Sequence, residues 1–171
     1  SKSNIGILIE LKSTTNKNEM ISVGNLNRKA LQELLLYYLR ERISKKNSDI
    51  KYLIATNVYE YFIFDAQEFE QKFYQNKKLK KEFQDFEDGR KTSRKTDFFY
   101  SEIASSFIEE VADSLDYTYF DIRFYAKYLG ENTASKKLIE LYKVFSDVHL
   151  LKLPFQNDSN SLNKRFYAEL L

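Results

Sequence analysis

The sequence contains no cysteine, one proline and four glycines in 171 residues. The absence of cysteine excludes disulfide bonds and thiolate metal sites, and it is typical of a reducing, cytoplasmic location. So few prolines and glycines favour long regular elements over a loop-rich fold. No apolar run approaches the roughly 20 residues of a membrane-spanning helix, and no signal-peptide pattern precedes Ile5. We therefore expect a cytoplasmic protein that does not associate with membranes.

A large excess of charge of one sign is also absent, because 27 Lys and Arg residues nearly balance 25 Asp and Glu residues. With a net charge of only +2, any affinity for nucleic acid must come from local patches. Hydrophobic residues make up 43% of the chain and aromatic residues 16%, which is enough for a core and argues against disorder. This length fits one domain, or one domain with an appendage.

The stretch from Ile5 to Lys12 predicts a buried β-strand that ends at the polar residues 13–16. Side chains alternate between the two faces of a strand, so Glu10 and Lys12 share one face, roughly 7 Å apart at their Cα atoms. Burying either charge alone is costly, so the two need each other, a metal ion or an anion. A structural ion pair and a nuclease site are both compatible with this pattern.

Between residues 26 and 43, apolar residues recur at the spacing of an amphipathic helix. Gln32 falls within the apolar arc of this helix at 3.6 residues per turn. A side-chain amide there needs a hydrogen-bond partner. Gln32 therefore either bonds a nearby backbone carbonyl or reaches the Glu10 and Lys12 site.

Two further strand patterns follow at residues 50–55 and 58–64, and the tight break between them favours a hairpin. From residue 67 onward the apolar residues recur mainly at helical spacing, while residues 117–120 are compatible with strand or loop. The sequence therefore predicts an α+β fold. A small mixed sheet with the 26–43 helix across one face forms in residues 1–66, and residues 67–171 are mainly helical.

The order of the Glu-x-Lys strand, the helix and the stretch 52–57 (Tyr-Leu-Ile-Ala-Thr-Asn) resembles the PD-(D/E)xK nuclease part of type I and type IIG restriction–modification enzymes. The stretches 83–90, 96–100 and 150–163 are similar to the region that joins nuclease to adenine methyltransferase in single-chain type IIG enzymes. The resemblance implies a Mg²⁺-dependent DNA endonuclease module with a restriction-endonuclease-like core, incomplete at its N-terminus, in residues 1–66. It implies a helical connector in 67–171 that leads to a methyltransferase domain absent from this chain.

The same resemblance implies roles for individual residues. Glu10 would bind Mg²⁺, the backbone carbonyl of Leu11 would be a second ligand, and Lys12 would be the catalytic lysine. Gln32 would be the glutamine of the following helix, although Leu36 stands where the usual Gln-x-x-x-Tyr pattern has tyrosine. The aspartate of the family motif would lie before residue 1, so this fragment by itself is expected to be inactive.

The expected partners are double-stranded DNA and the methyltransferase and target-recognition domains of the parent polypeptide, where S-adenosylmethionine would bind. The loop after residue 89 carries Arg90, Lys91, Arg94 and Lys95 without an acidic residue, so we predict that it contacts DNA phosphates. The competing hypothesis is a non-catalytic connector or interaction domain that supports a DNA methyltransferase, with Glu10 and Lys12 as a structural pair.

Overall fold

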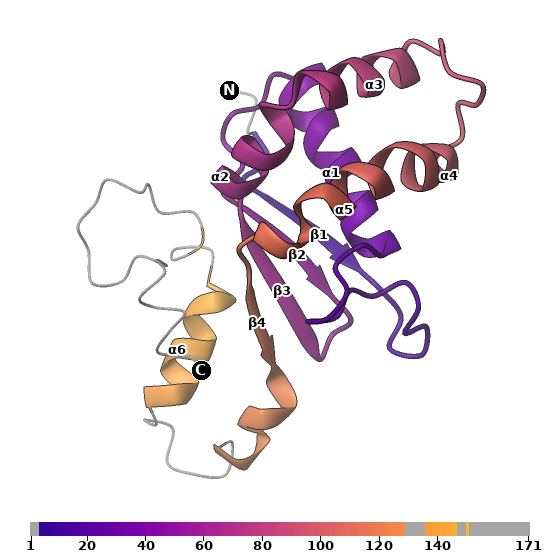
Figure 1. Ribbon diagram of the computed structural model, residues 1–171. Coiled ribbons are helices and arrows are strands. Elements are labelled where there is room, and N and C mark those ends of the chain that lie inside the picture. Colours follow the sequence, from indigo (N-terminus) through magenta and orange to yellow (C-terminus); the bar gives the residue numbers. More distant parts are fainter. Residues whose placement is uncertain (1–3, 129–135, 147–149, 151–171) are drawn as a thin grey trace.

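The computed structural model describes residues 4–128, 136–146 and 150, and it shows an α+β fold around one four-stranded sheet (Figure 1). The strand order is β1-β2-β3-β4, with β1 parallel to β2 and the other neighbours antiparallel. The predicted mixed sheet is thus confirmed. The strands are β1 (Ile7–Leu11), β2 (Tyr52–Thr56), β3 (Glu60–Asp65) and β4 (Thr118–Asp121).

Helices connect the strands and cover the sheet. The α-helices are α1 (Lys29–Leu39), α2 (Ala66–Phe69), α3 (Lys77–Glu87), α4 (Thr96–Phe98), α5 (Ser105–Val111) and α6 (Lys136–Val144). Three of them run on into wider π-helical turns at Arg40–Ser44, Glu70–Tyr74 and Phe99–Ala104. Two 3₁₀ segments lie at Ala112–Ser114 and Ile122–Tyr128. Within the described residues, every helix is too short or too polar to cross a bilayer.

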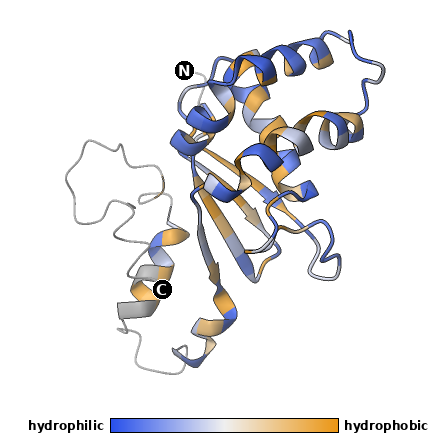
Figure 2. Ribbon diagram, viewed as in Figure 1, coloured by the Kyte–Doolittle hydropathy of each residue, from blue (hydrophilic) through white to orange (hydrophobic). Residues whose placement is uncertain are grey.

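The larger core lies between one face of the sheet and the helices α1, α2, α3 and α5 (Figures 1 and 2). Leu53 of β2 and Phe64 of β3 are neighbours in the sheet and are fully buried on this face. The apolar stripe of α1 faces them, as its periodicity predicts. Members of this core come from residues 20–115, so chain on both sides of residue 66 contributes. The domain boundary at residue 66 remains a prediction.

Residues 117–120, compatible with strand or loop in the sequence, contribute to β4, which pairs with β3. This strand adds to the same sheet that residues 7–65 begin. The predicted predominance of helix after residue 67 therefore holds for the described residues with this one exception. The stretch 150–163, one of those that resemble the region joining nuclease to methyltransferase, lies outside the described residues except for Leu150.

The opposite face of the sheet carries a smaller core. Ile54, Ile63 and Phe120, from the three strands β2 to β4, pack there with Leu138 and Leu141 of α6. This core reaches β1 only at Ile7, which is half-buried against it. Further along β1, 60% of Ile9 and 59% of Leu11 are exposed. The prediction of a buried strand is wrong on this face, because β1 is an edge strand and α6 packs nearer the other edge.

Candidate functional site

Glu10 and Lys12 lie on the same face of β1, as strand alternation predicts. The Nζ atom of Lys12 is 3.0 Å from Oε1 of Glu10. The backbone N–H of Lys12 donates to the carbonyl of Thr56 at 2.8 Å, which extends the pairing with β2 beyond the last residue of β1. This bond fixes Lys12 in register, so the ion pair belongs to the rigid sheet and not to the loop that follows.

A third charged residue, Glu33 of α1, completes the site. Its carboxylate accepts a hydrogen bond from the ammonium of Lys12. The exposed fractions of the three side chains are 13% for Glu10, 7% for Lys12 and 10% for Glu33. We call Glu10, Lys12 and Glu33 the buried triad; Lys12 and Glu33 are buried and Glu10 is half-buried. Glu19 lies at its rim, with 3.9 Å between its Oε2 and Lys12 Nζ.

Burial and neighbouring charges shift proton affinities in the buried triad. Burial, reinforced by the adjacent carboxylate of Glu33, raises the pKa of Glu10 from its ordinary 4.5 to about 7, and Lys12 only partly opposes this. Burial acts to lower the pKa of Lys12, but its bonds to Glu33 and Glu10 outweigh this effect and raise it. Burial, with the charges of Glu10 and Glu33, also raises the pKa of the nearby Tyr37 to about 12. At neutral pH the lysine is therefore charged, while Glu10 is poised to gain or lose a proton.

Gln32 does not join the buried triad. Its Nε2 donates to Oδ1 of Asn27 at 3.0 Å, and Asn27 in turn donates to the carbonyl of Ser105 and to Glu109. Neither expected partner, a backbone carbonyl or the Glu10 and Lys12 site, is the one observed. Adjacent helix residues point about 100° apart, so Glu33 faces β1 while Gln32 faces the loop before α1 and the start of α5.

The ligands expected for Mg²⁺ are present only in part. The carboxylate of Glu10 lies on the α1 face. The backbone groups of Glu10 and Lys12 point toward β2, and these groups alternate in direction along a strand. The backbone carbonyl of Leu11 therefore points away from β2, at the outer edge of β1. Among the described residues, no group of three or more His, Cys, Asp or Glu side chains is arranged to hold a metal ion. The two carboxylates of the buried triad already share the ammonium of Lys12. These residues alone therefore do not fit a Mg²⁺ site, which requires several oxygen ligands in octahedral geometry.

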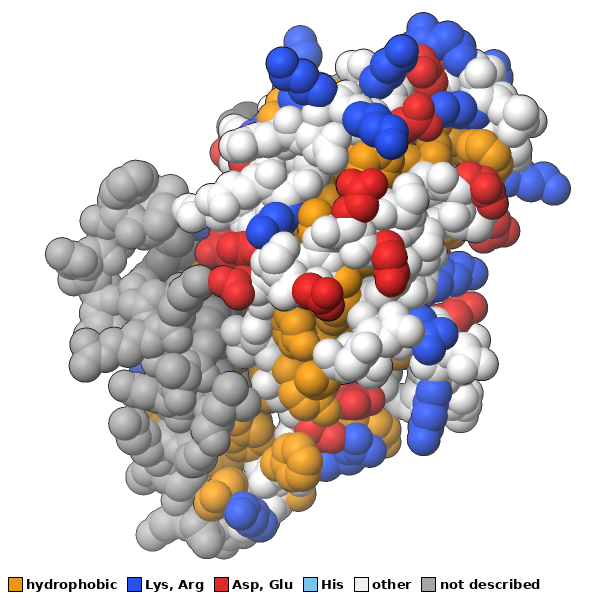
Figure 3. Space-filling model, in the orientation of Figure 1, with side chains coloured by type: hydrophobic (Ala, Val, Ile, Leu, Met, Phe, Trp, Pro, Cys, Tyr) orange, Lys and Arg blue, Asp and Glu red, His pale blue; other side chains and the backbone are white. Residues whose placement is uncertain are grey.

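The basic loop after α3 divides into two pairs of residues. Arg90 contacts Asp85 at 2.7 Å and Asp88 at 2.9 Å, and Lys91 contacts Glu82 at 2.5 Å. Arg94 and Lys95 are exposed, and neither forms an ion pair within the part of the chain that the structure describes. Figure 3 shows Lys and Arg interspersed with Asp and Glu over this region. Of the four residues predicted to contact DNA, Arg94 and Lys95 are therefore the two whose charges are not already paired with an acidic side chain among the described residues.

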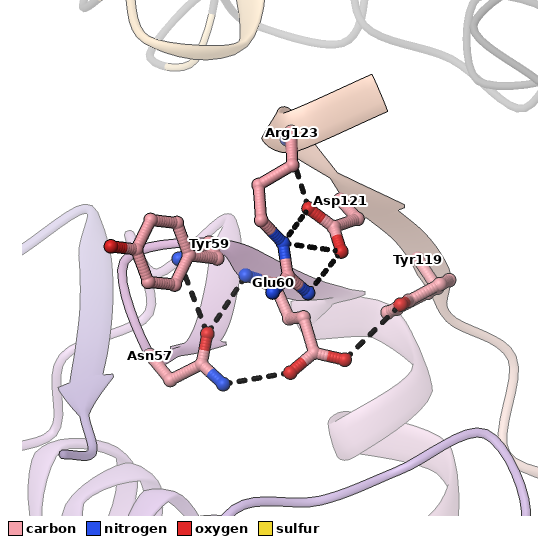
Figure 4. A network of polar contacts seen from close by, with 6 residues as sticks. All are labelled: Asn57, Tyr59, Glu60, Tyr119, Asp121 and Arg123. Carbon is pink, nitrogen blue, oxygen red and sulfur yellow. Dashed lines mark hydrogen bonds and ion pairs between the residues drawn. The ribbon is translucent and has the colours of Figure 1, made fainter. Parts of the chain in front are cut away.

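The β2–β3 turn and the end of β4 carry a second polar network that the sequence interpretation missed (Figure 4). Asn57 donates to Glu60 at 2.7 Å and Tyr119 donates to the same carboxylate at 3.2 Å. Asp121 forms an ion pair with Arg123, whose guanidinium lies 5.1 Å from the ring centre of Tyr59. These bonds fix the turn and join β3 to β4. The Asn at the tight break was the one available signal, since Asn side chains often bond the backbone of turns.

The fold and site thus define an α+β domain with a largely buried Glu–Lys–Glu cluster at the carboxyl end of the edge strand β1. Residues 1–158 match the family model described as "Domain of unknown function (DUF7149)", and the chain belongs to this family. No curated protein and no solved structure matches the chain.

Proposed function

We propose that this chain is the nuclease and connector part of a type IIG restriction–modification enzyme, and that it contributes to hydrolysis of phosphodiester bonds in double-stranded DNA. The observation that carries the proposal is the ion pair of Glu10 and Lys12, 3.0 Å apart at the carboxyl end of β1. The helix and the parallel strand that follow it, α1 and β2, support the proposal through the order of elements.

The chemistry of hydrolysis suits these residue types. A water molecule must lose a proton, and negative charge develops on the phosphate oxygens. A carboxylate with a pKa of about 7, as Glu10 has, is well matched to accept a proton at neutral pH. The ammonium of Lys12 supplies fixed positive charge for the transition state. Glu33 holds that ammonium from the α1 side and would act as a positioning residue.

A divalent metal ion would add charge neutralisation and a more acidic bound water. The buried triad provides only two carboxylates, which are too few to hold such an ion alone. The proposal instead requires at least one further ligand from residues that are not among those described. Methyl transfer and sequence recognition, with S-adenosylmethionine as methyl donor, would belong to other domains of the same cytoplasmic polypeptide.

Replacing Glu10 in the full-length polypeptide tests this proposal. Glu10→Gln preserves the shape of the side chain and removes its ability to accept a proton. We expect cleavage of unmethylated plasmid to fall at least about 100-fold, while methylation of the same plasmid continues at the wild-type rate. Wild-type cleavage by Glu10→Gln would refute a catalytic role for the site.

A second candidate function is that of a non-catalytic connector, and the mutual pairing in the buried triad favours it. The two carboxylates share the one ammonium, and all three side chains are largely withdrawn from solvent, as in a structural ion cluster. In that case substitutions in the buried triad would lower stability, and cleavage and methylation by the full-length enzyme would decline together. Measuring both activities on one preparation separates the two candidates.

A further inference from the structure

The first turns of α3 carry a concentration of positive charge. Four of the first five residues of this helix are lysines, and we call them the α3 lysine cluster: Lys77, Lys78, Lys80 and Lys81. Within the part of the chain that the structure describes, none of the four forms an ion pair with an acidic side chain.

The acidic side chains of α3 are bound by other cations. Glu82 and Asp85 lie four residues after Lys78 and Lys81, which is the spacing of helical ion pairs. These pairs do not form. Each acidic side chain of α3 and its C-cap is instead held at 2.5–2.9 Å by a basic residue outside the α3 lysine cluster: Glu82 by Lys91, Asp85 and Asp88 by Arg90, and Glu87 by Arg40. The charges of the cluster therefore stay uncompensated, although Lys and Arg alternate with Asp and Glu over this region in Figure 3.

Two of the lysines are held in place without loss of charge. The Nζ atom of Lys80 lies 4.1 Å from the ring centre of Tyr74, and that of Lys78 lies 5.6 Å from the ring centre of Phe107. An aromatic ring attracts a cation through its quadrupole and carries no counter-charge. These ammonium groups are thus ordered at the surface and still able to bind an anion.

The position of the cluster is unfavourable for the helix itself. The macrodipole repels cations near a helix N-terminus, and no acidic residue stands in the first turn of α3 to offset this effect. The backbone N–H groups of Lys78 and Leu79 donate to the side chain of Asn76 at 3.0 and 3.1 Å, so the helix end is already capped. An anion would therefore bind the lysine side chains. Local features that oppose stability are typical of functional surfaces.

We propose that the α3 lysine cluster contacts the phosphate backbone of duplex DNA, in addition to the loop after residue 89. The inference rests on the proposed function for its partner, DNA, whereas the surface itself follows from the ion pairs described above. Lysine ammonium groups neutralise phosphates without reading the base sequence, and the neutralised phosphates release their counterions. The cluster thus contributes affinity that falls with salt and does not depend on sequence.

Two other anionic partners fit this surface less well. A helix that binds an anionic membrane inserts its apolar face into the lipid, but the apolar face of α3 is buried in the larger core through Leu79, Phe83 and Phe86. None of the large exposed hydrophobic side chains of the described residues lies within 66–115. An acidic protein is disfavoured because lysine is depleted at protein–protein interfaces.

The salt dependence of DNA binding by the 171-residue chain tests the proposal. A labelled duplex of arbitrary sequence is titrated with the chain in the absence of Mg²⁺, between about 50 and 200 mM salt. The double variant Lys77→Gln, Lys81→Gln removes two exposed charges one helical turn apart. We expect it to flatten the plot of log affinity against log salt by up to about two units, about 0.9 for each lost phosphate contact.

The double variant Lys46→Gln, Lys127→Gln is the matched control. Both residues are exposed, lie outside α3 and form no ion pair among the described residues, so this variant loses the same charge and should keep the wild-type slope. A wild-type slope in the α3 variant, or equal flattening in both variants, would overturn the proposal. Displacement of the DNA by polyglutamate at equal charge would also overturn it, in favour of an acidic protein partner.

This assay measures binding alone, and its result is separate from that of the cleavage test with Glu10→Gln. Unaltered binding by the α3 variant together with loss of cleavage by Glu10→Gln would overturn the contact surface and leave the nuclease function. A flattened slope together with wild-type cleavage by Glu10→Gln would refute the catalytic role and support the contact between the α3 lysine cluster and DNA.

Discussion

Glu10 of β1 and Lys12, the residue just after this strand, form an ion pair largely withdrawn from solvent, with 3.0 Å between Oε1 and Nζ. The pair is not isolated, since Glu33 of α1 binds the same ammonium from the other element. Two carboxylates thus share one lysine in a site with little access to water. This arrangement makes Glu10 the group whose protonation is most easily measured, because its pKa of about 7 lies in an experimentally convenient range.

Stability should depend on the charge of Glu10. Its pKa is higher in the native state than its ordinary value of 4.5, so the native state binds the proton more tightly than the unfolded state does. Raising the pH from about 4.5 to about 7 therefore lowers the free energy of unfolding, by up to about 3 kcal/mol. We expect Glu10→Gln to lack this decline, as measured by urea denaturation at pH 5 and pH 8. Parallel pH dependences in the two proteins would contradict the assigned pKa.

DNA binding should depend unequally on the four basic residues of the loop. Arg94 and Lys95 are exposed and free of ion pairs within the described residues, whereas Arg90 and Lys91 contact acidic side chains of the α3 region. Replacing Arg94 and Lys95 with Gln should flatten the plot of log affinity against log salt by up to about two units, one per lost phosphate contact. The matched double variant of Arg90 and Lys91 should change the slope less. Identical slopes in the wild type and both variants would mean that the loop does not contact DNA.

The contact between Glu10 and Lys12 could be predicted because strand periodicity alone decides which side chains share a face. The third member of the buried triad, Glu33, could not be predicted from the sequence. A helical pattern identifies the apolar stripe of α1, but it does not say which turn of the helix lies over the end of β1. Glu33 is tolerated in the buried surface of α1 only because Lys12 neutralises it, and that pairing depends on tertiary packing. The neighbouring Gln32, which the same pattern leaves free to reach the site, bonds Asn27 instead.

The position of β1 at the edge of the sheet, as the described residues form it, could not be predicted either. An apolar strand with Ile, Leu and Ile in succession is typical of burial on both faces, which predicts strands on both sides. Sequence pattern does not give strand order, and the position of β1 at the edge leaves Ile9 and Leu11 exposed. The residues 117–120 could not be assigned to strand or loop from the sequence for the same reason. Their pairing with β3 becomes favourable only once the sheet exists.

The isolated chain should not cut DNA, even with Mg²⁺. The described residues provide no group of three acidic or histidine ligands, so metal affinity should be weak. A nicking assay on supercoiled plasmid should therefore show no metal-dependent activity above that of a Glu10→Gln preparation, which controls for contaminating nucleases. Methyl transfer by the chain should also be undetectable. Mg²⁺-dependent nicking by the wild-type chain that disappears in Glu10→Gln would show that the described residues suffice for catalysis.

The most direct test of the central claim is the single-turnover rate of DNA cleavage by the full-length polypeptide with Lys12 replaced. Lys12→Ala removes the cation and leaves two buried carboxylates, which can cost about 3–5 kcal/mol in stability. Lys12→Gln retains a hydrogen-bond donor for them, so it serves as the better-folded second variant. We predict that both variants lose cleavage by at least about 100-fold while Lys12→Gln methylates DNA at the wild-type rate. Cleavage by Lys12→Gln at close to the wild-type rate would contradict the account and make the buried triad a structural ion cluster.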